Sequence, residues 1–129
     1  MELFQIGASG GSSGQRRQRA AIEAARRTLS SEIGARPADI VFTSGATEAI
    51  DLAIKTLVTP GGEVLCSAFE HPAVFGALES VGAHIRCIPN DSLGRIDVFD
   101  IKEELTEHTQ LVILMAAQNE IGNLYPVAE

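Results

Sequence analysis

Residues 40–48 read Ile40-Val41-Phe42-Thr43-Ser44-Gly45-Ala46-Thr47-Glu48, a short apolar run followed by small residues and then by a helical pattern. This order predicts a strand, a tight turn and the start of a helix. At a helix start the first backbone N–H groups have no intrahelical partners, and the positive end of the helix dipole lies there. We therefore expect an anion such as a phosphate to bind at Ala46 and Thr47.

Strand and helix patterns alternate on both sides of this segment. Strands are expected at residues 40–42, 63–67, 84–88 and 111–116, and helices at 15–33, after Gly45, from Pro72 to Gly82, and from Asp97 to about Glu107. Strands that alternate with helices of this length need right-handed crossovers and a largely parallel sheet. The predicted fold class is therefore α/β, a mostly parallel sheet with flanking helices.

Length and charge narrow the classes of function. The chain has 129 residues, enough for one domain, and a formal net charge of −7, which argues against nucleic acid as a partner. The basic residues of the first helix are expected to form a solvated face, because Arg19, Glu23 and Arg27 have the i,i+4 spacing of ion pairs. No segment is long and apolar enough for a membrane span, and the N-terminus lacks a basic leader with a hydrophobic core. A cytoplasmic location is expected.

The two cysteines, Cys66 and Cys87, each lie in an apolar segment with a strand pattern. Two cysteines are too few for a disulfide framework, so both are predicted to be reduced and buried. A zinc site from Cys66, His71 and Cys87 is not expected, because no closely spaced ligand pair supports it. No metal is expected.

Polar residues follow three of the predicted strands at the point where each strand ends. They are Ser44 to Thr47, Glu70 with His71, and Gln118-Asn119-Glu120. In open parallel sheets, ligands bind beyond the carboxyl ends of the strands, where such groups meet. The chain has neither a G-x-G-x-x-G fingerprint nor a Walker A loop, so the two commonest phosphate-binding motifs are excluded.

Three motifs together resemble those of the cysteine desulfurases, a branch of the class V aminotransferase group. They are Phe42-Thr43-Ser44-Gly45-Ala46-Thr47-Glu48-Ala49, Glu70-His71-Pro72-Ala73-Val74 and Asn119-Glu120-Ile121-Gly122. Similar segments occur in that family in the same order and at similar separations. The resemblance implies that residues 15–129 are part of the large domain of a fold-type I pyridoxal-phosphate enzyme, with three α/β/α layers, preceded by a Gly/Ser-rich loop at residues 1–14.

The resemblance also implies roles for individual residues. Ala46 and Thr47 would hold the phosphate of pyridoxal 5'-phosphate, His71 would stack on the cofactor ring and assist proton transfer, and Asn119 would reach the ring hydroxyl or the substrate. Each position has a structural alternative: a helix cap for Thr47 and for His71, and a loop amide for Asn119. Gln118 stands where the family usually has a second asparagine.

The implied reaction converts L-cysteine, or a related amino acid, to alanine with transfer of sulfur to an enzyme persulfide. The family is normally a homodimer, passes sulfur to acceptor proteins and serves iron–sulfur cluster assembly. The lysine that binds the cofactor, the acid at the pyridine nitrogen and the nucleophilic cysteine are expected beyond Glu129, so this chain alone should be inactive. The alternative is a non-catalytic α/β module that binds a phosphate ligand or, through an open sheet edge, a partner protein.

Overall fold

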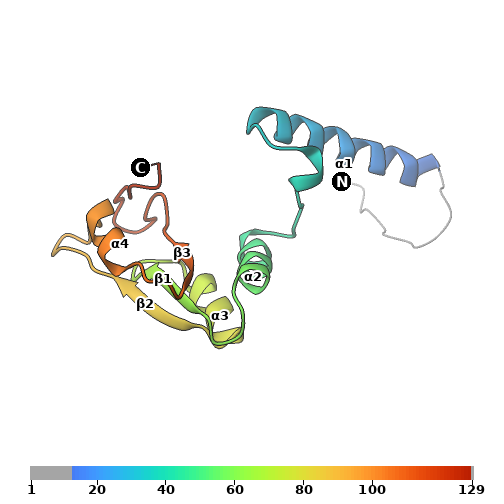
Figure 1. The fold of residues 1–129 in the computed structure, drawn as a ribbon. Coiled ribbons are helices and arrows are strands. Elements are labelled where there is room, and N and C mark those ends of the chain that lie inside the picture. Colours follow the sequence, from blue (N-terminus) through green and yellow to red (C-terminus); the bar gives the residue numbers. More distant parts are fainter. Residues whose placement is uncertain (1–12, 129) are drawn as a thin grey trace. The chain divides into compact units, whose positions relative to one another are not determined.

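The computed structural model describes residues 13–128 and divides into two compact units on either side of the Phe42–Thr43 bond. The first unit contains α1 (Ser13–Glu32) and a short 3-10 helix, η1 (Pro37–Asp39). The second contains α2 (Ala46–Leu57), β1 (Glu63–Ser67), α3 (Pro72–Ser80), β2 (His84–Ile88), α4 (Val98–Glu104) and β3 (Thr109–Ile113) (Figure 1). Most of the loop predicted at residues 1–14 lies outside the described residues, and α1 begins at Ser13.

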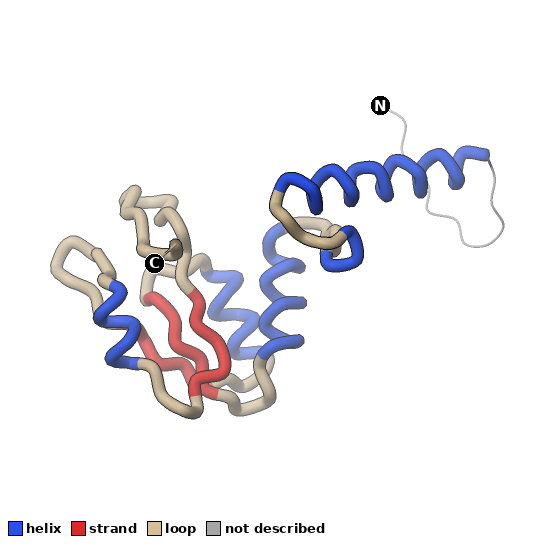
Figure 2. The backbone as a smooth tube through the Cα atoms, turned by 45° about the horizontal axis from the view of Figure 1, so that its top comes forward, coloured by secondary structure: helices blue, strands red, loops and turns tan. Residues whose placement is uncertain are grey.

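The second unit is built on a parallel sheet in which the strand order is β2-β1-β3. Glu63 pairs with His84 in β2 and with Thr109 in β3, so the first residues of the three strands lie side by side. All three strands therefore end at the same edge of the sheet. This arrangement confirms the predicted α/β fold with a parallel sheet (Figure 2).

Helices cover both faces of this sheet. On one face Val64 and Cys66 pack with Ile54 of α2 and Leu78 of α3. On the other face a second cluster lies under α4 and joins strand residues to the C-terminal segment; its members include Leu65, Ile88, Ile96, Tyr125 and Ile101. Burial of apolar surface on both faces, worth about 25 cal/mol per Å², is what holds α2, α3 and α4 against the strands. The three predicted layers are thus present.

The strand predicted at residues 40–42 is wrong. This segment is extended but unpaired, and Val41 is 65% exposed. A strand exists only where its backbone bonds to a neighbour, and within residues 13–128 no segment pairs with this one. Its polar contacts are local instead: Arg26 Nη1 donates to the Ile40 carbonyl, and the Arg26 guanidinium carbon lies 5.1 Å from the centre of the Phe42 ring.

Other element boundaries follow their predicted signals to different degrees. β1, β2 and α3 match the prediction, and Gly82 ends the last of these with a φ of +62°. The helix that Asp97 caps ends at Glu104, three residues early, because Leu105 is extended. The last strand is shifted toward the N-terminus and stops at Ile113. In α1 the observed ion pair joins Glu23 to Arg26 at 3.3 Å, rather than the pairs expected at i,i+4.

The prediction that both cysteines are buried holds for only one of them. Cys66 in β1 is fully buried, whereas its neighbour Cys87 in β2 is exposed. β2 is an edge strand, and only its last residue, Ile88, reaches full burial. No helix among residues 13–128 is both long and apolar enough to cross a bilayer.

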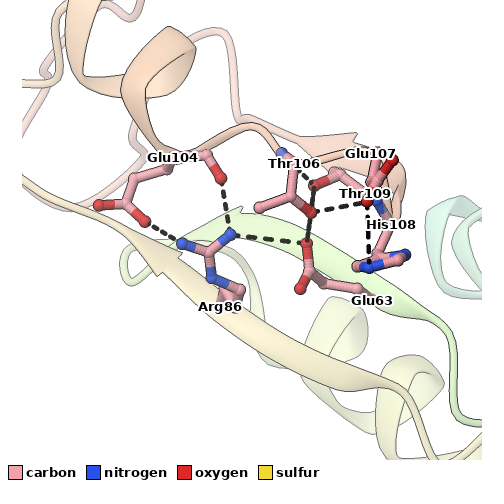
Figure 3. A network of polar contacts seen from close by, with 7 residues as sticks. All are labelled: Glu63, Arg86, Glu104, Thr106, Glu107, His108 and Thr109. Atoms are coloured by element: carbon pink, nitrogen blue, oxygen red, sulfur yellow. Dashed lines mark hydrogen bonds and ion pairs between the residues drawn. The ribbon is translucent and has the colours of Figure 1, made fainter.

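A polar network joins the amino ends of the strands to the end of α4 (Figure 3). Glu63 Oε1 accepts hydrogen bonds from the hydroxyls of Thr106 at 2.7 Å and Thr109 at 2.8 Å. Arg86 donates to the Glu104 carbonyl at 2.7 Å and lies 3.5 Å from Glu63 Oε1. The network fixes the segment between α4 and β3 at the edge of the sheet opposite the predicted site.

The loop after β2 is fastened to the C-terminal segment. Asp91 Oδ1 accepts from the backbone N–H groups of Leu93 and Arg95, which forms a tight turn around Gly94. Gly94 has a φ of +73°, and its carbonyl accepts the Tyr125 hydroxyl at 3.1 Å. A Cβ atom at Gly94 would lie 3.2 Å from Phe69 Cζ, so both the conformation and the space there favour glycine.

Replacing Gly94 with alanine should therefore cost more than a conformational penalty. We expect Gly94→Ala to lower the free energy of unfolding by about 2–3 kcal/mol, from the positive φ and the crowding together. Gly82→Ala is the matched control, because Gly82 also has a positive φ but nothing within 4 Å, and it should cost about 1 kcal/mol. Urea unfolding followed by circular dichroism measures both. Equal losses of unfolding free energy in the two variants would show that crowding at Gly94 makes no contribution.

The polar network predicts a dependence of stability on pH. The hydroxyls of Thr106 and Thr109, with a smaller contribution from Arg86, hold the pKa of Glu63 below its ordinary value. A carboxyl with a lowered folded pKa stabilises the fold above its unfolded pKa, and this contribution is lost as the pH falls through the folded value. Glu63→Gln should therefore be less stable than the unmodified chain near pH 7, and the difference should shrink as the pH falls below about 4.3, the ordinary pKa of a glutamate. Unfolding curves across this range test it, and a difference independent of pH would contradict it.

Candidate functional site

The first turn of α2 leaves backbone donors free. Gly45 is the N-cap residue, and the Glu48 carboxylate reaches back to accept from the backbone N–H and the hydroxyl of Ser44, each at 2.6 Å. These bonds hold the pKa of Glu48 below its ordinary value. The N–H groups of Ala46 and Thr47 donate to no described residue, and the side chain of Thr47 is exposed. The turn is thus ordered by Ser44 and Glu48 while two donors stay available to an anion.

His71 is the N-cap residue of α3. Its Nδ1 atom accepts the Ala73 N–H at 3.1 Å, which is the structural alternative that the sequence left open for this residue. Because Nδ1 acts as the acceptor, the neutral ring carries its proton on Nε2. The cap therefore fixes the tautomer and leaves Nε2–H on an exposed ring.

Glu70 connects the loop that carries His71 to the end of β3. This carboxylate is buried, and its Oε1 atom accepts the Ser67 hydroxyl at 3.0 Å and the Met115 N–H at 2.6 Å. Ser67 is the last residue of β1, and Met115 lies two residues past the end of β3. Glu70 therefore ties the loop before α3 to the ends of β1 and β3.

Gln118 and Asn119 have different environments. Gln118 is buried, and its Oε1 atom accepts from the N–H groups of Glu120 at 2.5 Å and Ile121 at 2.8 Å. Gln118, which stands where the family usually has an asparagine, thus closes the turn that begins at its own position. Asn119 is exposed, and its side-chain amide bonds to no other residue between 13 and 128.

Two hollows lie near these residues. One, of about 510 Å³, separates the first turns of α2 and α3, and Thr47, Asp51, Ala73 and Gly76 are among its walls. The other, of about 480 Å³, lies between loops that follow the three strands and is bounded by Phe69, Gly94 and Ile121, among others. Neither His71 nor Asn119 lines either hollow.

Among residues 13–128, the predicted site residues make no hydrogen bond with one another, and only indirect links join them. Thr47 shares a hollow with Ala73, and the Ala73 N–H is bonded to His71. Asn119 lies four residues after Met115, whose N–H is bonded to Glu70, the neighbour of His71. Ala46, Thr47 and His71 lie at helix starts and Asn119 lies in the loop after β3, but Ala46 and Thr47 follow an unpaired segment rather than the predicted strand.

Two further side chains contact the loop after β2 and were not indicated by the sequence. The Tyr125 hydroxyl is bonded to Gly94, and its pKa is raised, chiefly by burial. Asn123 Nδ2 donates to the Leu93 carbonyl at 2.8 Å. Both contacts span about thirty residues of sequence, so no local pattern indicates them.

This chain resembles known proteins over nearly its whole length. Residues 4–129 match the family described as Aminotransferase class-V. Cysteine desulfurase IscS of Dictyoglomus turgidum is 40% identical over 121 residues, which cover 88% of this chain and 31% of that protein. The mitochondrial cysteine desulfurase of Drosophila melanogaster is 38% identical over 116 residues, which cover 84% of this chain and 25% of that protein. The chain thus spans between a quarter and a third of these relatives.

Solved structures agree with this result. The crystal structure of DndA from Streptomyces lividans aligns with a TM-score of 0.76 and 35% identity, covering 92% of this chain and 36% of that one. SspA in complex with cysteine aligns with a TM-score of 0.79 and 31% identity, over the same shares of both chains. The fold is that of the fold-type I enzymes to which these structures belong. On this evidence the chain belongs to the class V aminotransferase family.

Proposed function

We propose that this chain is the part of a cysteine desulfurase-like enzyme that binds the phosphate of pyridoxal 5'-phosphate. The observation that carries the proposal is the pair of free N–H groups at Ala46 and Thr47, at the start of a helix in a chain whose relatives include cysteine desulfurases. The class V family depends on pyridoxal phosphate. A dianionic phosphate is the ligand that such a helix start favours, because N–H dipoles and the helix dipole both point at it.

The residues present fit this group. The N–H groups of Ala46 and Thr47 and the Thr47 hydroxyl are positioned to donate to phosphate oxygens, and Gly45 places no side chain over them. The Glu48 carboxylate is already engaged by Ser44, which takes part of its charge into local hydrogen bonds. The same residues would bind the phosphate without rearranging the first turn of α2.

His71 and Asn119 act on the rest of the cofactor in this proposal. The His71 ring, held by its bond to Ala73, presents a flat face for stacking and a proton at Nε2. The Asn119 amide donates to, or accepts from, the ring hydroxyl. When bound, pyridoxal phosphate supplies a ring that withdraws electrons from the α-carbon of an amino acid.

The activity of the whole enzyme extends beyond this chain. We propose L-cysteine, or a related amino acid, as the substrate, with alanine and a protein persulfide as products, and a homodimer with a sulfur-acceptor protein as the assembly. The relatives named as cysteine desulfurases and the structure of SspA with cysteine support this choice. The 129-residue chain alone should release no sulfide from L-cysteine, because it has no identified lysine for the cofactor and no identified nucleophilic cysteine.

Nuclear magnetic resonance titration of the chain tests the phosphate site. We expect pyridoxamine 5'-phosphate, which forms no Schiff base with Lys55 or Lys102, to shift the Ala46 and Thr47 amide resonances in a saturable way. Pyridoxamine without phosphate should leave them unchanged. Thr47→Val should weaken binding about tenfold to a hundredfold, from the loss of one hydrogen bond to a charged group.

The matched control is Thr56→Val, at the other end of α2; among the described residues the Thr56 hydroxyl is bonded only to the Leu52 carbonyl. It should bind as the unmodified chain does. Shifts that spread along β2 or β3 instead of α2, or equal shifts from both pyridoxamine compounds, would contradict the proposal. Equal affinity for inorganic phosphate would favour the alternative, a module that recognises phosphate alone.

A further inference from the structure

The two cysteines occupy paired positions in neighbouring strands. Cys66 in β1 and Cys87 in β2 are direct partners in the parallel register. Partners in a ladder point to the same face of the sheet, and neighbouring strands lie about 4.8 Å apart. This spacing falls within the roughly 4.4–6.8 Å between Cα atoms that a disulfide needs. Both thiols are free.

The two thiols differ in their access to solvent. Cys87 is exposed at the edge strand, whereas Cys66 has no exposed surface and belongs to the core cluster with Ile54, Val74 and Leu78. A dissolved oxidant can therefore reach only one member of the pair directly. The buried partner lies beside it on the inner strand.

We propose that Cys87 and Cys66 form an oxidation site in which Cys87 reacts first with hydrogen peroxide and Cys66 then closes a disulfide across β1 and β2. In the first step the Cys87 thiolate attacks one peroxide oxygen and the O–O bond breaks, giving a sulfenic acid and hydroxide. In the second step the Cys66 thiol gives up its proton to solvent, and the thiolate attacks the sulfenic sulfur. The S–O bond breaks, and the departing hydroxide takes up a proton from solvent. Two thiols lose two electrons, and peroxide becomes two molecules of water.

The surroundings of Cys66 make the second step slow at neutral pH. Burial among the apolar side chains of α2, α3 and β1 raises its pKa to about 11, and Cys87 and Glu70 are the titratable groups that add to this. Attack requires the thiolate. While the pH is below this pKa, the rate of the closing step should therefore rise about tenfold for each unit by which the pH is raised. The sulfenic acid should therefore persist near pH 7 and close faster in mild alkali.

Peroxide treatment of the 129-residue chain tests the site. A brief pulse is ended with catalase, and the products are mapped by mass spectrometry of peptides. We expect dimedone to label Cys87 and not Cys66 near pH 7. Without dimedone, both thiols should be lost to one intramolecular disulfide, on the order of a hundredfold faster near pH 9 than near pH 7.

Two variants separate the steps. Cys87→Ser, a change at an exposed position, should abolish both the dimedone adduct and the disulfide and leave Cys66 reduced. Cys66→Ala should keep the dimedone adduct on Cys87 and lose the disulfide. If this change in the core prevents folding, the peptide map of the unmodified chain still shows which cysteine is labelled first and which two cysteines are joined. A disulfide between two copies of the chain, first labelling at Cys66, or closure at a rate independent of pH would each overturn the proposal.

Discussion

One buried carboxylate organises the carboxyl edge of this sheet. Glu70 Oε1 accepts from Ser67 at the end of β1 and from Met115 just past the end of β3. A buried carboxyl group without hydrogen-bond partners would be costly, so these bonds stabilise the loop before α3 at the core. The loop carrying His71 and the segment leading to Asn119 are consequently held by a common group.

The opposite edge is fixed by different chemistry. There Glu63 accepts hydrogen bonds from the hydroxyls of Thr106 and Thr109 and lies near Arg86, and all of these groups are partly exposed. Surface charge networks contribute little individually, so the apolar layers on both faces supply most of the stability. The polar groups at each edge instead determine where the connecting loops lie. The N–H groups of Ala46 and Thr47 in the first turn of α2 take part in neither set of contacts.

The sequence predicts much of this molecule, because most of its signals are local. The parallel strands, the Asp97 cap and the helix start at Ala46 all depend on residues within a few positions of one another. The missing strand at residues 40–42 could not be foreseen, since a strand depends on a partner that no local pattern specifies. The exposure of Cys87 likewise depends on the strand order, which leaves β2 at an edge. Contacts such as Tyr125 with Gly94 join distant segments and have no local signature.

We conclude that Glu70 holds the loops after β1 and β3 together at the carboxyl edge of the sheet. Amide hydrogen exchange at Met115 tests it most directly, because its N–H donates to Glu70 alone among the described residues. The Met115 amide should be protected in the unmodified chain and should exchange much faster in Glu70→Ala, while the Leu65 amide in β1 keeps its protection. Rapid exchange at Met115 in the unmodified chain, or unchanged protection in the variant, would contradict the account.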